Sequence, residues 1–225
     1  MFQPTPEGAL WWDAQKTLIV SDLHLEKGSS YARRGQLLPP YDTGATLGIV
    51  ERLTAQFRPE RVISLGDSFH DASSEERLAA CDVARIRRLT DSCEWFWVEG
   101  NHDPDPPAHL GGTGINTLRI GECVFRHEPA GERGEIAGHL HPVARIGGRG
   151  RSVRRKCFVT DGEQMIMPSL GTLTGGLNVL DEAVTACFAQ SPSIFVTSTQ
   201  SVYFADARTL RRDVSDRGGN SGWRL

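Results

Sequence analysis

The sequence lacks the features that mark several large classes of protein. It contains no run of about 18 apolar residues, so we expect no membrane span. Residues 1–8 lack the basic region and apolar core of a secretory signal. The five cysteines are odd in number and never spaced C-x-x-C, which argues against a disulfide framework and a thiolate zinc site. We therefore expect reduced, mostly buried thiols in a cytoplasmic protein.

Lysine is scarce, and the chain has no excess of positive charge. Only 3 of its 25 basic residues are lysine, and 28 acidic residues give a formal charge of −3. This balance excludes a global attraction to nucleic acid. Arginine is nevertheless the better bidentate phosphate ligand, and bound cations would neutralise part of the acidic total.

Size and composition are those of an ordinary globular domain. The chain has 225 residues, of which 39% are hydrophobic and 24% charged, enough for one core without a covalent staple. We expect a single domain over residues 1–210. Residues 211–225 contain Gly218-Gly219 and little apolar material, so we expect a flexible tail there.

Histidine is sparse but grouped. Six of the seven histidines lie in short polar fragments, and each fragment follows a short apolar run that we predict to be a buried strand. The fragments span residues 22–24, 66–71, 100–103, 126–128 and 138–141. Side chains just past strand ends are typical of the sites of open α/β sheets.

The fragments carry a ligand mix for divalent metals. Imidazole, carboxylate and one carboxamide suit borderline ions such as Mn²⁺, Fe²⁺ or Zn²⁺. Seven candidate ligands exceed one tetrahedral site and suit two ions that share a carboxylate, an arrangement used to clamp phosphoryl groups. Each fragment alone has an ordinary interpretation: Asp22 as a turn residue, or His139 and His141 as surface residues. Their joint occurrence favours the metal site.

The apolar pattern predicts an α/β protein with a second sheet. We expect strands at residues 10–12, 17–21, 61–65 and 94–98 and helices at 43–57 and 74–91, with Asp42 or Thr43 as an N-cap. Residues 22–41 are expected to form a loop over the site. After residue 114, short runs broken by Gly and Pro predict a largely antiparallel sheet. Trp11 and Trp12 are interpreted as packing residues, with base stacking as the alternative.

The order D-x-H, G-D-x-x-H-D, G-N-H-D, H, G-H-x-H resembles the calcineurin-like metallophosphoesterase superfamily. Within it, residues 11–12, 21–28, 34–43 and 66–71 resemble the bacterial DNA-ligase-associated metallophosphoesterases. The resemblance covers roughly residues 10–205. It implies a four-layer αββα sandwich of two mixed β-sheets flanked by helices.

The resemblance also implies a role for each ligand. One ion would be held by Asp22, His24 and His141, the other by Asn101, His127 and His139, with Asp67 bridging both. The two ions, with Mn²⁺ favoured and Fe²⁺ or Zn²⁺ as alternatives, would lie about 3.5–4 Å apart and hold a bridging hydroxide for in-line attack on phosphorus.

The same resemblance implies that His102 acts on the leaving group. Asp103 could orient His102 as its hydrogen-bond partner, or could simply cap the loop.

These roles predict a dinuclear metal-dependent phosphodiesterase, in particular a nuclease acting on DNA in a ligase-associated repair system. The resemblance implies association with a DNA ligase, a helicase and an exonuclease. The alternatives are a small-molecule phosphoesterase, a cyclic-nucleotide phosphodiesterase, or a non-catalytic scaffold for DNA-repair partners.

Two residues depart from the superfamily pattern. His70 stands where Asp is frequent, and we interpret it as a partner of a ligand, with direct ligation as the alternative. Glu128 stands where Gly is frequent and could restrict which ester enters, or could be a solvated loop acid.

A basic stretch follows the last ligand, His141, almost directly. Its arginines could contact a DNA backbone, or could belong to a solvated hairpin tip. The substrate-binding candidates are Arg149, Arg151, Arg154 and Arg155.

Overall fold

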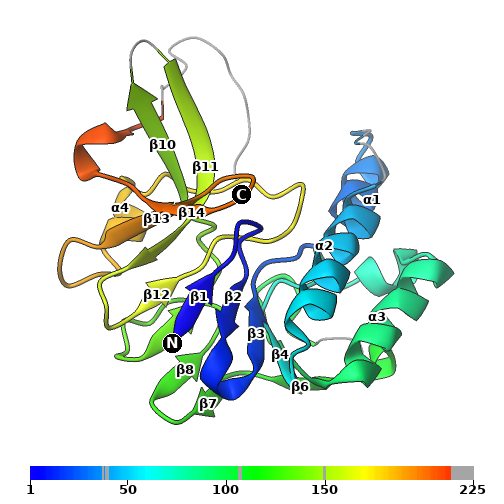
Figure 1. Ribbon diagram of the computed structural model, residues 1–225. Helices are drawn as coiled ribbons and strands as arrows, with labels where there is room; N and C mark the ends of the chain where they lie inside the picture. The colour runs from blue at the N-terminus through cyan, green and yellow to red at the C-terminus, as the bar shows by residue number, and fades with distance from the viewer. Residues whose placement is uncertain (37, 39–40, 106–107, 149–150, 214–225) are drawn as a thin grey trace.

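The computed structural model describes residues 1–213 except 37, 39–40, 106–107 and 149–150. Two β-sheets pack face to face, with helices on the outer face of each (Figure 1). The predicted αββα sandwich of two mixed sheets is therefore confirmed. In the described part of the chain, no helix has the length and apolar character needed to cross a membrane.

The first sheet is mostly parallel. Its order is β1 (Phe2–Pro4), β2 (Leu10–Trp12), β3 (Thr17–Val20), β4 (Arg61–Leu65), β5 (Glu94–Val98) and β6 (Thr113–Ile115). Strands β3 to β6 pair in parallel, while β1 and β2 are antiparallel. Because β3 and β4 are covered on both faces, they are nearly continuous apolar runs. Parallel pairing sends the loops after β3, β4 and β5 to one edge of this sheet.

The second sheet is mixed but mostly antiparallel, as predicted. Its strands are β7 (Leu118–Ile120), β8 (Cys123–Phe125), β9 (Glu135–Ala137), β10 (Val143–Gly148), β11 (Arg151–Thr160), β12 (Met165–Ile166), β13 (Ser193–Thr197), β14 (Val202–Phe204) and β15 (Leu210–Arg211). The order is β14-β13-β11-β12-β9-β8-β7, and β10 pairs with β11 and β15. The exceptions to antiparallel pairing are β8 with β9 and β9 with β12. Because β8 and β9 are parallel, the fragments that follow them leave the sheet at the same edge.

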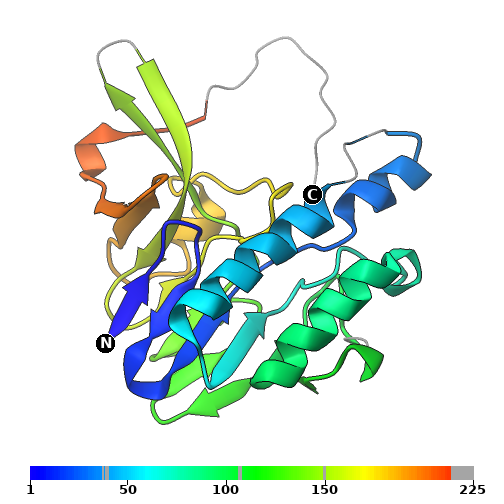
Figure 2. The same ribbon diagram turned by 45° about the vertical axis from the view of Figure 1, so that its right-hand side comes forward.

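Helices form the outer layers. Figure 2 shows α2 (Asp42–Phe57) and α3 (Ala80–Ser92) side by side against the first sheet. The short α4 (Glu182–Thr185) packs on the second sheet. The core between the sheets contains fully buried Phe125 and Phe158. Trp11 stacks on Phe57 with ring centroids 5.0 Å apart, so it serves packing rather than base stacking.

The structure differs from the predictions in three segments that contain helices. Residues 22–41 are not all loop, because α1 (Lys27–Arg33) lies within them. Asp42 and Thr43 do not cap α2; their side chains accept backbone N–H groups from Gly28 and Glu26 instead. The helix predicted over 74–91 is divided into a 3₁₀ turn at 74–77 and α3, because Ala79 is extended.

The predictions for the chain end and the thiols are also modified. Arg211 lies in β15, paired with Arg145 of β10, so the predicted tail starts inside a strand. Residues 214–225 lie outside the described part of the chain. The cysteines are free thiols, as expected, but only Cys157 is buried and Cys81 is exposed. The expectation of mostly buried thiols is therefore wrong.

Glycines at the start of two polar fragments allow the two sheets to approach. A Cβ atom on Gly138, just past β9, would overlap Ser21 Oγ and Asp22 Oδ2 past β3. A Cβ on Gly66 would lie 2.5 Å from the ring of His127. The contact between the loops of the two sheets therefore has no room for side chains at these positions.

We expect Gly138→Ala to destabilise the fold even without metal. The added methyl forces Asp22 or its loop to move, at the cost of about 1–3 kcal/mol typical of overpacking. At about 2–4 °C per kcal/mol for a chain of this size, the melting temperature in EDTA should fall by several degrees. Scanning calorimetry measures this shift. Gly175→Ala is the matched control, because nothing lies within 4 Å of a Cβ there. Equal melting temperatures for the two variants would contradict the expectation.

Candidate metal centre

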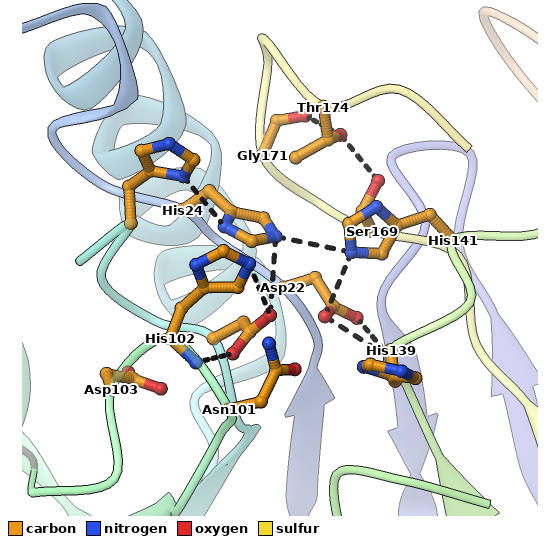
Figure 3. Close-up of polar contacts among 12 residues, drawn as sticks. Asp22, His24, Asn101, His102, Asp103, His139, His141, Ser169, Gly171 and Thr174 are labelled. Atoms are coloured by element: carbon orange, nitrogen blue, oxygen red, sulfur yellow. Dashed lines mark hydrogen bonds and ion pairs between the residues drawn. The ribbon is translucent and has the colours of Figure 1, made fainter. Parts of the chain in front are cut away.

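The five polar fragments meet in space. Three leave the first sheet after β3, β4 and β5, and two leave the second sheet after β8 and β9. Figure 3 shows side chains from both sheets turned toward a common centre. The seven residues predicted as ligands form two groups there.

The first group is Asp22, His24 and His141, and all three side chains are buried. The Nε2 atom of His141 lies 3.0 Å from Asp22 Oδ1 and 3.3 Å from His24 Nε2. Two imidazole nitrogens and a carboxylate oxygen therefore face one point.

The second group is Asp67, His127 and His139, with Asn101 beside it. His127 Nε2 lies 2.9 Å from Asn101 Oδ1, 3.1 Å from His139 Nδ1 and 3.4 Å from Asp67 Oδ1. His127 Nδ1 lies 2.9 Å from the carbonyl oxygen of Leu65. Donating its proton there leaves Nε2 free as a ligand.

The two oxygens of Asp67 face different groups. Oδ1 lies toward His127, and Oδ2 lies 3.7 Å from His24 Nε2 in the first group. The backbone N–H of His102 also donates to Oδ1 at 3.0 Å. Asp67 thus stands between the groups, where a carboxylate could serve two cations.

The electrostatics of the cluster suit cations. Burial lowers the pKa of His24 to about 3, which keeps its imidazole neutral, the form that binds metal. Burial also opposes protonation of His127, yet the carboxylates of Asp67 and Asp22 raise its pKa to about 9. The field between the carboxylates therefore favours positive charge. The residues present fit two divalent cations.

The backbone at this centre is unusual. Five of the ligand candidates have a left-handed backbone: Asp22 (φ 51°), His24 (φ 44°), Asp67 (φ 46°), His139 (φ 68°) and His141 (φ 45°). Elsewhere in the described chain, only Lys16, Glu26 and Arg58 among non-glycine residues do so. Sharp turns just past the strand ends aim these side chains inward.

His102 lies beside the centre and Asp103 supports it differently from the prediction. His102 is partly exposed, with Nε2 4.0 Å from Asp67 Oδ2. Asp103 makes no hydrogen bond to the His102 side chain in the described structure; its Oδ2 accepts the backbone N–H of Phe69 at 3.0 Å. Asp103 therefore joins the loop after β5 to the loop after β4. Burial raises its pKa to about 7, and Oδ1 lacks a partner.

His70 contacts a ligand rather than joining either group. Its Nδ1 lies 3.4 Å from Nδ1 of His24, on the side of the ring away from His141. The ring also stacks on His102, with centroids 5.3 Å apart and planes tilted by 17°. This position agrees with the interpretation of His70 as a partner of a ligand.

The candidate arginines are not brought to the centre as a set. Arg149 lies outside the described residues. Arg154 donates to the carbonyl oxygen of Gly176 and pairs with Asp213 at 3.4 Å. Strand alternation places Arg151 and Arg155 on the opposite face of β11. Both are exposed, and neither makes a hydrogen bond or ion pair with a ligand candidate in the described chain.

Sequence reasoning missed two supporting residues. Ser21 donates a 2.5 Å hydrogen bond to Asp22 Oδ2. Lys156, directly after Arg155, turns inward and donates to Gly171 O at 2.8 Å. Gly171 N in turn donates to Asp22 O. Burial lowers the pKa of Lys156 to about 8. Adjacency to Asp22 could have indicated Ser21, whereas nothing local indicates the inward turn of Lys156.

Comparisons with known proteins identify a family and similar solved structures. The calcineurin-like phosphoesterase family matches residues 15–183, well over half of the chain. A crystal structure of Pseudomonas putida nuclease MPE is 27% identical, with a TM-score of 0.69, over 91% of this chain and 100% of that one. A phosphoesterase from E. coli, Yfce, is 17% identical, with a TM-score of 0.40, over 83% of this chain and 95% of that one. No curated protein matches the chain. The ligand order, the two-sheet fold and the family match together show that the chain belongs to the calcineurin-like phosphoesterase family.

Proposed function

We propose that this metallophosphoesterase is a phosphodiesterase that cleaves DNA. The observation that carries the proposal is the position of Asp67 between two donor groups, with His102 beside it. That arrangement suits in-line attack on the phosphorus of a phosphate ester, with His102 beside the leaving oxygen. The DNA substrate is supported by the likeness to a nuclease over nearly the whole chain.

The groups would hold two divalent cations. Their mix of imidazole and oxygen ligands suits Mn²⁺, Fe²⁺ or Zn²⁺, of which we propose Mn²⁺. When bound, such ions stabilise charge on the phosphoryl oxygens and activate water for in-line attack. The chain's own residues orient the ligands, exclude water behind them and hold a proton at His102 for the leaving oxygen. Asp103 keeps the His102 loop against the Asp67 loop through Phe69.

A substrate comparison tests the proposal. Purified protein is assayed on single-stranded DNA, duplex DNA, a cyclic nucleotide and a phosphomonoester, each with Mn²⁺, Fe²⁺ or Zn²⁺. Cleavage of DNA with little action on the monoester is expected. Efficient hydrolysis of only the cyclic nucleotide or the monoester would replace DNA with a small-molecule substrate. We further propose a cytoplasmic role in ligase-associated repair, which co-purification with a DNA ligase, a helicase or an exonuclease would support.

Removing a metal-facing group should abolish activity without unfolding the protein. For Asp67→Asn and His139→Asn we expect a loss of more than about 100-fold, beyond the usual effect of losing an indirect metal partner. Metal analysis should show fewer than two ions per chain, while circular dichroism stays unchanged. Asp91→Asn, an exposed carboxylate on α3, is the control. Near-normal rates with both metals retained would contradict the assigned roles.

His102→Ala should slow the reaction in a way that depends on the leaving group. A general acid contributes about 10²–10⁴-fold when the leaving oxygen is basic, as in DNA. The loss should be much smaller for p-nitrophenyl esters, whose leaving group needs no proton. His109→Ala, an exposed histidine, is the control. An equal loss on both esters would mean that His102 orders the site instead.

The exposed arginines of the β10–β11 hairpin are proposed to contact the DNA backbone. Replacing Arg151 and Arg155 with Ser should then weaken DNA binding and flatten its salt dependence. On single-stranded DNA, two lost phosphate contacts reduce the slope of log K against log[salt] by about 1.4. Fluorescence anisotropy across a salt titration measures this. The pair Arg88→Ser and Arg133→Ser removes the same charge elsewhere. An unchanged slope would make the hairpin a solvated feature.

A further inference from the structure

A cavity of about 400 Å³ opens directly beside the metal centre. Its wall includes the ligand candidates Asn101 and His127. The other side chains lining it come from the ends of β5 and β8 and from the loops beside them: Glu99, Pro104, Asn116, Thr117, Arg126 and Glu128. A volume of this size lies within the range of ligand-binding pockets.

The polar groups of this cavity are mainly hydrogen-bond acceptors. Asn116 donates its amide to Glu99 Oε2 at 3.0 Å, and Thr117 donates to Asn116 Oδ1 at 3.2 Å. The other oxygen of Glu99 accepts no hydrogen bond within the described chain. Glu128 is exposed and makes no hydrogen bond or ion pair with any described residue. Carboxylate oxygens are therefore available to an incoming donor.

Among the described residues of the lining, the cation is Arg126, and it is already engaged. Arg126 donates to Glu132 Oε2 at 2.7 Å, and its Nε lies 3.5 Å from Glu135 Oε2. Its charge is balanced outside the cavity by Glu132 and Glu135, so the carboxylates that remain for a ligand are those of Glu99 and Glu128. On this side of the cavity, away from the metal-facing groups, they disfavour a second phosphate and favour a neutral group rich in N–H donors.

We propose that this cavity binds the nucleobase attached to the retained side of the scissile phosphodiester and prefers a base that carries an exocyclic amino group. The inference rests on the proposed function, because it places the phosphorus at the metal centre. The side of the substrate follows from the lining. Asn101 and His127 belong to it, whereas His102, which is proposed to act on the leaving oxygen, does not.

Base chemistry makes the preference specific. Cytosine presents an amino group that a Glu carboxylate can accept, whereas thymine presents a carbonyl oxygen at the corresponding position. A carbonyl oxygen beside Glu99 or Glu128 would be repelled and would leave the carboxylate without a partner. Pro104 adds an apolar surface for the ring. Discrimination therefore comes from acceptance of one base and rejection of the other.

The test uses esters that share one leaving group. The p-nitrophenyl esters of deoxycytidine 5′-phosphate and thymidine 5′-phosphate are compared with bis(p-nitrophenyl) phosphate. We expect the deoxycytidine ester to have a kcat/KM about tenfold higher than the thymidine ester, mainly through KM, as suits one charge-assisted hydrogen bond. The double variant Glu99→Gln, Glu128→Gln should reduce this ratio to about one. Glu122→Gln, an exposed acid outside this cavity, should keep it.

A second readout does not depend on catalysis. Deoxycytidine and thymidine lack phosphate, so calorimetric titration reports the cavity alone, and deoxycytidine should bind more tightly to the wild-type protein. If neither DNA nor bis(p-nitrophenyl) phosphate is hydrolysed, the proposed function fails, and the titration alone decides whether the cavity selects bases. Equal kcat/KM and equal binding for the two bases would overturn the inference. A preference that survives in the double variant would also overturn it.

Discussion

Two carboxylates, Asp22 and Asp67, are buried within one cluster, and much of the surrounding structure compensates their charge. A buried charge is costly unless hydrogen bonds and opposite charges surround it. The Asp22 carboxylate accepts hydrogen bonds from the Ser21 hydroxyl and the backbone N–H of His139. The Asp67 carboxylate accepts one from the backbone N–H of His102. These donors come from both sheets. The hydrogen bonds to the two acids thus hold the loops of the two sheets together. Gly66 and Gly138 allow these loops to approach closely enough for the bonds to form.

The sequence predicted the parts of this structure that depend on local pattern. Apolar runs such as Leu18-Ile19-Val20 mark buried strands, and the polar residues just after them become neighbours once the strands pair in parallel. The same reasoning located Asp22, Asp67 and Asn101 correctly at one sheet edge. His127 and His139 also lie together at one edge of their sheet, because β8 and β9 are parallel as well. No periodicity showed that the two sheets would face each other; that expectation came from the resemblance, which the family match supports.

What the sequence did not predict depends on partners far along the chain. Asp42 resembles a helix cap, but Gly28 offers its side chain a free N–H in the folded protein. Asp103 stands next to His102, yet the side chains of adjacent residues point apart. The carboxylate of Asp103 instead accepts the backbone N–H of Phe69. The arginines of the β10–β11 hairpin follow His141 closely. Strand alternation nevertheless turns Arg154 toward Gly176 and places Arg155 on the other face, which no count of residues from a ligand reveals.

The left-handed backbone of the ligand candidates restricts which residues can replace them. Asp, Asn and His tolerate that conformation better than other residues with a Cβ atom, and they are also the oxygen and nitrogen ligands that divalent metals accept. Chemistry and conformation therefore select the same few amino acids at Asp22, Asp67 and His139. Glutamate could supply a carboxylate, but its side chain is longer and it adopts the left-handed backbone conformation less readily. Asp, Asn and His are consequently the side chains that these turns can carry without a change of backbone, even where an exchange among them removes a metal-binding atom.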